Sequence, residues 1–190
     1  MIFGKRVRLR ALNQEDLPLF VEWLNDPEVV RGLTHYQPFS LEDEKDWYEG
    51  MRKMPQEERP LMVDVRIDTK WKPIGDLGLF GIDWRIRSAE FGIVIGEKAY
   101  WDQGYGTEAM ELILKHGFET LNLNRIYLRV YEDNLRAIRV YKKTGFKQEG
   151  NLRQAHFQDG SYMDVILMSI LRSDWDQSDV KRRMGDTHVR

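Results

Sequence analysis

A strand, a glycine turn and a helix follow one another in the middle of this chain and constrain its fold more than any other feature. Residues 89–95 (AEFGIVI) are rich in apolar and β-branched side chains and predict a strand. The run QGYGT at 103–107 predicts a tight turn, because glycine adopts backbone conformations that other residues avoid. Apolar residues then recur at helical spacing and predict an amphipathic helix: Met110, Ile113, Leu114, Gly117, Phe118 and Leu121.

The turn at 103–107 is suited to bind a phosphate or a diphosphate. Two glycines one residue apart let several backbone N–H groups point at one spot. The helix that follows adds unpaired N–H groups and the positive end of its dipole. The turn lacks the Gly-Lys-Ser/Thr ending of a Walker loop and the third glycine of a dinucleotide-binding loop. We therefore expect a phosphorylated ligand other than ATP or NAD.

The length of 190 residues favours a single domain, large enough to bury roughly 70% of the surface of the unfolded chain. The sequence shows no internal repeat and no low-complexity block. We assign residues 1–173 to one domain. Residues 174–190 are polar, and we expect them to form a loose C-terminal tail.

Charge and composition argue against several classes of function. The net charge of −2 gives no overall field that would attract nucleic acid or an anionic membrane. The absence of cysteine excludes disulfides, a cysteine nucleophile and thiolate metal sites, and no histidine–carboxylate cluster has metal-ligand spacing. No apolar run approaches the ~20 residues of a membrane span, and no signal-peptide core is present. We expect a cytoplasmic protein without a metal.

The remaining segments complete an α/β pattern. Further strands are predicted at 7–10, 61–67, 74–80 and 125–131. Capping residues predict helices after Asn13 and after Ser40, and a third helix that begins near Asn134 and ends at Gly145. Residues 146–170 contain more strand-like sequence, with a turn at 158–160.

In the order of these elements and in several short motifs, the chain resembles the GCN5-related N-acetyltransferase (GNAT) superfamily. The motifs are QGYG at 103–106, NLRA at 134–137, Tyr141, and GF at 145–146. The segments VRLR at 7–10 and WLNDP at 23–27, with Trp101, are similar to ribosomal-protein N-terminal acetyltransferases and to bacterial spermidine and diamine acetyltransferases. The likeness covers about residues 6–171. The superfamily turn usually begins with Gln or Arg where this chain has Trp101, which removes a side-chain contact but leaves the backbone cradle.

The resemblance implies a mixed, largely antiparallel sheet flanked by helices and splayed open between the strands at Ile93 and Leu128 to admit acetyl-coenzyme A. It implies that the exposed backbone of Ile93, Val94 and Ile95 hydrogen-bonds the pantetheine amides, as an added strand would. The diphosphate contacts that it implies are Gln103, Gly104, Tyr105, Gly106 and Thr107.

The reaction implied by the resemblance is transfer of acetyl to a primary amine. Because the chain has no cysteine, an acyl-cysteine intermediate is excluded, and direct attack by the amine within a ternary complex is the simplest mechanism. The acceptor is either a polyamine or diamine, or a protein N-terminal amine, and a homodimer is expected from family likeness. The alternative is a coenzyme A-binding sensor or interaction module without catalysis. An intact Tyr141 and Asn134 argue against that alternative.

Asn134, Ala137 and Tyr141 share one face of their helix, because they lie at i, i+3 and i+7. An amide, a small residue and a phenol suit an extended ligand, although Asn134 can equally cap the helix and Tyr141 can pack in the core. With the resemblance, Tyr141 becomes the candidate general acid for the departing thiolate. A thiol titrates near ~8.5 and a tyrosine near ~10, so we expect Tyr141 to act through a hydrogen bond to the sulfur.

The attacking amine must be neutral, so a base is expected for an acceptor whose pKa is near ~10.4. Glu90 is the first candidate, with an exposed strand-edge carboxylate or a structural ion pair as the alternative; His35 and His156 are secondary candidates. A run of five carboxylates predicts a solvated helix face or, if it lines the acceptor groove, a surface that attracts a cationic amine: Glu42, Asp43, Glu44, Asp46 and Glu49.

Overall fold

The structure, a computed structural model, describes residues 1–34 and 37–185. The chain forms two compact units, one made of Met1–Phe80 and Gly92–Leu112, the other of Gly81–Phe91 and the chain from Ile113 onward. Each unit is therefore built from two separate stretches of sequence. The assignment of residues 1–173 to a single domain stays a prediction.

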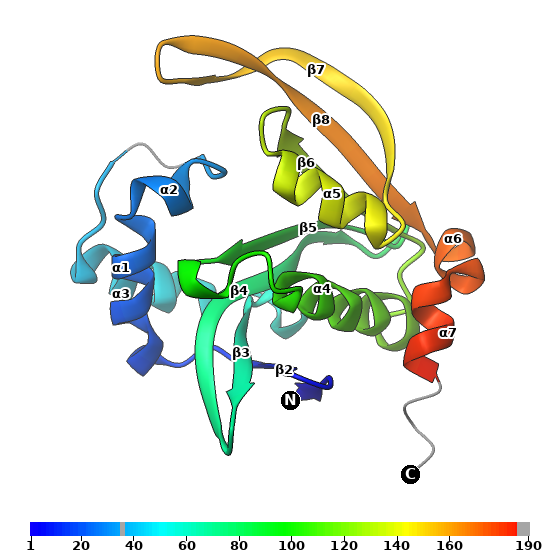
Figure 1. Ribbon diagram of the computed structural model, residues 1–190, viewed down its shortest axis with the longest axis horizontal. Coiled ribbons are helices and arrows are strands. Elements are labelled where there is room, and N and C mark those ends of the chain that lie inside the picture. The colour runs from blue at the N-terminus through cyan, green and yellow to red at the C-terminus, as the bar shows by residue number, and fades with distance from the viewer. Residues whose placement is uncertain (35–36, 186–190) are drawn as a thin grey trace. The chain divides into compact units, whose positions relative to one another are not determined.

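The described residues form an eight-stranded sheet in the order β1-β2-β3-β4-β5-β6-β8-β7. The β5–β6 pair is parallel, whereas β1–β2, β2–β3, β3–β4, β6–β8 and β7–β8 are antiparallel. A mixed, largely antiparallel sheet flanked by helices is thus confirmed (Figure 1). The strands are β1 (Ile2–Phe3), β2 (Val7–Ala11), β3 (Leu61–Ile67), β4 (Lys70–Asp83), β5 (Ser88–Ile95), β6 (Arg125–Tyr131), β7 (Lys147–Gln158) and β8 (Ser161–Leu171).

Three helices of the first unit lie between β2 and β3 in sequence: α1 (Leu17–Leu24), α2 (Pro27–Val30) and α3 (Leu41–Met51). The predicted cap of α3 is present, because Ser40 Oγ accepts from the Asp43 N–H at 3.1 Å and Asp43 accepts from the Ser40 N–H at 2.8 Å. Apolar side chains of α1 and α3 pack on Met62 of β3 and form a buried cluster: Leu17, Phe20, Trp23 and Met51. This packing fixes α3 against one face of the sheet.

Two helices follow β5 and β6. Helix α4 (Tyr105–Lys115) continues into a π-helical turn at His116–Thr120, and α5 (Leu135–Lys143) follows β6. Gly145 has φ +101°, the left-handed conformation expected of a glycine just beyond a helix. The parallel register of β5 and β6 runs from Ser88–Arg125 to Glu90–Tyr127, although β5 continues to Ile95 and β6 to Tyr131. The paired stretch is therefore short, as an open sheet requires.

Strands β7 and β8 form one long hairpin (Figure 1). Its two-residue turn contains Asp159 at φ +51° and Gly160 at φ +79°. Positive φ at both positions is the geometry that favours an Asp-Gly pair in hairpins. The turn predicted at 158–160 is confirmed.

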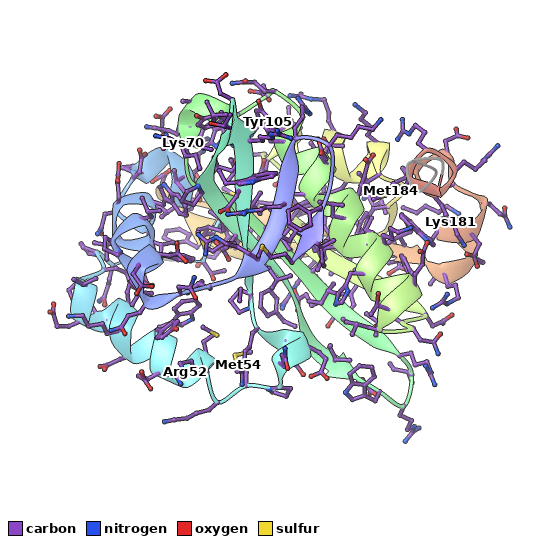
Figure 2. The ribbon with its side chains drawn as sticks, turned by 90° about the horizontal axis from the view of Figure 1, so that it is seen from below. Arg52, Met54, Lys70, Tyr105, Lys181 and Met184 are labelled. Carbon is purple, nitrogen blue, oxygen red and sulfur yellow. The ribbon has the colours of Figure 1, made fainter. Side chains whose placement is uncertain are left out.

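The expected loose tail from residue 174 is wrong as far as the structure describes it. Helices α6 (Arg172–Gln177) and α7 (Asp179–Gly185) occupy this segment, and Figure 2 shows Lys181 and Met184 on α7. Trp175 is fully buried and stacks on Phe118 at a ring-centroid distance of 5.7 Å. The segment from residue 174 is polar in composition, so the sequence did not indicate that Trp175 is buried. Within the described ranges, no helix is both long and apolar enough for a membrane span.

Replacing Trp175 with alanine is expected to destabilise the protein by about 3–5 kcal/mol, because a buried aromatic side chain is lost and a cavity remains. Urea unfolding followed by circular dichroism measures the difference. Trp84, which is 51% exposed, provides the control Trp84→Ala with an expected change near zero. Equal midpoints for the two variants would contradict the buried role of Trp175.

Candidate active site

The turn before α4 has the backbone geometry of an anion receptor. Gly104 has φ +82° and Asp102 has φ +59°, so two of the three residues before Tyr105 are left-handed. Helix α4 begins at Tyr105, which Figure 2 labels, and the first N–H groups of a helix have no partner inside it. The carbonyl of Gly104 already accepts the first helical hydrogen bond, from the Glu108 N–H at 3.0 Å. The N–H groups of 105–107 therefore define the expected diphosphate position.

The two glycines of the turn differ in what they do. Position 104 requires glycine, because a backbone φ of +82° is strained for any residue that has a Cβ atom. Gly106 is not among the residues with positive φ, and an added Cβ would lie 3.5 Å from Ile95 Cγ1, an ordinary contact. Gly104 thus has the left-handed conformation of a glycine turn, whereas Gly106 lies within α4, and its expected contact with the diphosphate stays a prediction.

Arg6, which is not among the site residues expected from the sequence, lies beside this turn. Its Nη1 donates to the Gln103 carbonyl at 3.2 Å, and its guanidinium carbon lies 4.6 Å from the centre of the Tyr105 ring. The Arg6 Nε also donates to Glu108 at 3.1 Å, so the first-turn carboxylate is directed to Arg6. The result is a partly exposed cation beside the backbone cradle. No local sequence pattern predicts the contact between Arg6 and the turn, because Arg6 and Gln103 are 97 residues apart.

Trp101 does not replace the missing polar side chain of the turn. Its indole N–H donates to the Ile95 carbonyl at 2.6 Å, and its ring packs against the helical cluster of the first unit. The Val94 carbonyl lies against Gly75 of β4, where an added Cβ would collide with it. Two of the three residues expected to bind pantetheine, Val94 and Ile95, thus have their carbonyls in contact with protein. Their contact with pantetheine, and that of Ile93, stays a prediction.

In the second unit, α5 carries Asn134, Ala137 and Tyr141. Asn134 caps the helix, since its side-chain oxygen accepts from the Ala137 N–H at 3.1 Å. Tyr141 is 8% exposed and packs edge-on against Phe91, with ring centroids 6.4 Å apart. Burial raises the pKa of Tyr141 to about 12. The phenol therefore stays protonated, as a hydrogen-bond donor, across the working pH range of an enzyme.

Glu90 forms the ion pair that was the alternative to a catalytic role. Its two oxygens accept from Arg129 Nε at 2.8 Å and Nη2 at 3.0 Å. A forked pair of this kind occupies both carboxylate oxygens. Glu90 is thus poorly suited to take a proton from an amine. Arg129 lies 39 positions away in the chain, so no local pattern predicts it as the partner.

The structure describes one of the two histidine candidates for the base, His156. His156 is buried, stacks on Tyr131 with ring centroids 3.7 Å apart, and has Nε2 3.4 Å from Gln158 Oε1. His35 lies outside the described residues. Within the part of the chain that the structure describes, no group of three or more histidine or acidic side chains is placed to hold a metal ion.

The carboxylate run on α3 is mostly a solvated face, with one exception. Glu42 pairs with Lys45 at 3.7 Å and Glu49 with Arg52 at 3.8 Å, and Asp43 caps the helix. Asp46 is exposed. Glu44 instead is 3% exposed, and burial raises its pKa. The sequence could not separate it from its neighbours, because all five carboxylates lie in one short helical stretch.

A family profile described as an acetyltransferase (GNAT) domain matches residues 6–147. Spermidine N(1)-acetyltransferase from Vibrio cholerae is 32% identical over 170 residues, which cover 90% of this chain and 95% of that protein. The protein of the same name from Escherichia coli K12 is 32% identical over 166 residues, covering 87% and 86%.

A solved structure is similar over nearly the same length. It is the crystal structure of spermidine N-acetyltransferase from Vibrio cholerae in complex with CoA and spermine. The TM-score is 0.83 at 29% identity, over 92% of this chain and 100% of that chain. The family match at residues 6–147 includes both α3 and α5.

Proposed function

Because the chain belongs to the GNAT acetyltransferase family, we propose that it acetylates a primary amine of a polyamine such as spermidine. The class of reaction is that of the family: the chain is an acetyl-coenzyme A-dependent N-acetyltransferase. The choice of a polyamine as the acceptor is supported by the similarity to two spermidine acetyltransferases, at 32% identity over 90% and 87% of this chain. A protein N-terminal amine is the other acceptor considered from the sequence.

The coenzyme A diphosphate binds the backbone of 103–107 in this proposal. Support comes from the left-handed Gly104, from the start of α4 at Tyr105, and from the guanidinium of Arg6 beside the turn. In the same proposal, the pantetheine amides bind the backbone of residues 93–95. Roles of Asn134 and Ala137 in cofactor binding stay predictions.

The chemistry is direct attack. The neutral amine nitrogen bonds to the acetyl carbonyl carbon, the carbon–sulfur bond breaks, and the sulfur leaves with the electron pair. Tyr141 donates a hydrogen bond to that sulfur. Its pKa of about 12 lies above the ~8.5 of a thiol, so the proton stays largely on the phenol while the bond strengthens as the sulfur gains charge. The proton that neutralises the thiolate comes finally from the amine, through solvent or a base.

Turnover with a panel of acceptors tests this function. We expect spermidine and related polyamines to give kcat/KM values at least about tenfold above those of N-terminal peptides, a difference of ~1.4 kcal/mol in transition-state binding. Coenzyme A release measures the rate, and acetyl-coenzyme A without an amine gives the background. A preference for peptides would contradict the polyamine assignment. Binding of acetyl-coenzyme A without turnover on any amine would favour the sensor module.

The cytoplasmic location and the homodimer stay predictions. Neither enters the mechanism.

A further inference from the structure

Arg6 immediately precedes β2, and its guanidinium is held by three contacts although the side chain is 50% exposed. Nε donates to Glu108 at 3.1 Å, Nη1 donates to the Gln103 carbonyl at 3.2 Å, and the guanidinium carbon lies over the Tyr105 ring at 4.6 Å. An exposed ion pair by itself contributes little to stability, because both long side chains lose freedom when they pair in water. A guanidinium whose direction is fixed in this way is instead suited to bind an anion such as a phosphate.

Glu108, in the first turn of α4, attaches this arginine to the helix. Its Oε1 accepts from the backbone N–H of Arg6 at 2.7 Å and from that of Val7 at 3.2 Å, while Oε2 accepts from Arg6 Nε. The Glu108 side chain is 16% exposed, and these three donors offset its negative charge. An unpaired carboxylate at this end of the helix would repel a phosphate, so the pairing leaves the turn usable for an anion.

The second terminal nitrogen of Arg6 lies beside the turn and is available for a ligand. Within residues 1–34 and 37–185, Arg6 Nη2 has no hydrogen-bond partner. It lies 3.4 Å from the position that a Cβ atom on Gly104 would occupy. Gly104 is the left-handed residue directly before the first N–H groups of α4. The N–H groups of Arg6 Nη2 and those of the helix start are therefore found at the same turn.

Other polar side chains that lead into the turn are engaged with protein. Gln103 Nε2 donates at 2.5 Å to a carbonyl of the 3₁₀ turn that precedes it. The Lys98 ammonium lies 2.7 Å from Asp26 and 2.6 Å from Glu28, so two carboxylates offset its single charge. Compared with Gln103 and Lys98, Arg6 is the better donor for an anion at the turn, through Nη2.

We propose that Arg6 binds the diphosphate of acetyl-coenzyme A through Nη2 and makes the protein select acetyl donors that carry this group, with Glu108 as its positioning residue. This rests on the proposed function and names a residue that determines its donor specificity. A hydrogen bond from a charged donor to a phosphate is stronger than one from a neutral donor. Because pantetheine separates the diphosphate from the thioester, Arg6 acts on donor binding and not on acetyl transfer.

Steady-state kinetics with two acetyl donors and saturating spermidine test this inference. Acetyl-coenzyme A carries the diphosphate, whereas S-acetyl-pantetheine has the same thioester and amides without a phosphate. Arg6→Gln should raise KM for acetyl-coenzyme A about 10- to 100-fold and change kcat by less than about twofold. With S-acetyl-pantetheine, this variant should keep the kcat/KM of the unchanged protein. Isothermal titration calorimetry with coenzyme A should show the same factor in Kd as in KM.

Lys5→Gln is the matched control, because it removes the same charge at the neighbouring position. Lys5 is exposed and has no part in the proposed site, so this variant should keep the KM of the unchanged protein for both donors. Arg6→Lys keeps the charge but cannot donate to Glu108 and Gln103 in one fork, and we expect it to recover only part of the affinity. S-acetyl-dephospho-coenzyme A keeps the diphosphate and lacks the 3′-phosphate, so Arg6→Gln should weaken its binding as much as that of acetyl-coenzyme A.

Glu108→Gln tests the positioning role through the sign of its effect. The substitution removes a negative charge near the diphosphate, which by charge alone would tighten the binding of acetyl-coenzyme A. It also removes the acceptor of Arg6 Nε, and we expect this loss to dominate and to raise KM about 3- to 10-fold. Combined with Arg6→Gln, the same substitution should weaken binding no further, because the guanidinium that Glu108 positions is already absent. Tighter binding in Glu108→Gln would overturn its positioning role.

The outcomes separate failure of this inference from failure of the function. The role of Arg6 is overturned by a KM for acetyl-coenzyme A that matches that of Lys5→Gln, or by an equal loss with both donors. It is also overturned if the effect of Arg6→Gln disappears with S-acetyl-dephospho-coenzyme A, because the 3′-phosphate would then be the partner. Absence of turnover by the unchanged protein, with either donor and every amine tested, overturns the proposed function instead.

Discussion

Replacing Tyr141 with phenylalanine is expected to lower kcat for acetyl transfer roughly 100-fold and to leave the affinity for acetyl-coenzyme A unchanged. The substitution removes only the hydroxyl. The ring keeps its edge-on contact with Phe91 and its contact with Phe146 at 5.9 Å, so the fold should be preserved. The hydrogen bond to sulfur strengthens as negative charge develops, and its loss therefore acts on the transition state.

The experiment compares kcat from coenzyme A release with Kd from isothermal titration calorimetry. Tyr162→Phe is the control, because Tyr162 is 66% exposed on the β7–β8 hairpin and has no proposed role in the reaction. Because burial raises the pKa of Tyr141 to about 12, the hydroxyl stays protonated and the rate should not fall between pH 9 and 10 through its ionisation. An unchanged kcat in Tyr141→Phe would remove the residue from the mechanism.

Replacing Gly104 with valine is expected to weaken acetyl-coenzyme A binding by about 10- to 100-fold, corresponding to ~1–3 kcal/mol of backbone strain. The native φ of +82° is unfavourable for a β-branched residue. The turn must therefore change shape, and the N–H groups that should meet the diphosphate no longer converge. Space is not the cause, because an added Cβ would lie 3.4 Å from the Arg6 side chain.

Gly160→Val is a closely matched control for strain. Gly160 has φ +79°, nothing lies within 4 Å of an added Cβ, and the residue belongs to the β7–β8 turn. Both variants should lose a similar amount of stability, whereas Gly104→Val alone should lose affinity for acetyl-coenzyme A. Unchanged affinity in Gly104→Val would contradict the position of the diphosphate. Gly106→Ala should fold normally, and its affinity then reports how closely the ligand approaches residue 106.

Local patterns predicted the fold where short stretches decide their own conformation. The Ser40–Asp43 cap, the strand at 125–131 and the Asp159–Gly160 turn each depend on residues within a few positions. The same holds for Gly104, whose conformation the sequence anticipated. Strand β4 extends beyond its predicted range of 74–80 at both ends. At the first end, pairing with β3 recruits Lys70, Lys72 and Pro73, which have no strong strand preference of their own.

Contacts between distant residues could not be predicted from one sequence. Arg129 pairs with Glu90 across 39 positions, and Arg6 reaches Gln103 across 97. The burial of Glu44 depends on which side of α3 faces the sheet, and five neighbouring carboxylates gave no sign of that orientation. The candidate site was therefore anticipated in its backbone and only partly in its charged groups.

The stacking of Trp175 on Phe118 determines where the chain can be shortened for expression and crystallisation. A product that ends at residue 173, the boundary suggested by composition, would expose the Phe118 ring to water. It would also leave Glu119 without the indole N–H of Trp175, which donates to its carboxylate at 3.3 Å. Uncovered aromatic surface of this kind promotes association between molecules. A soluble shortened product should therefore retain both terminal helices, through Gly185.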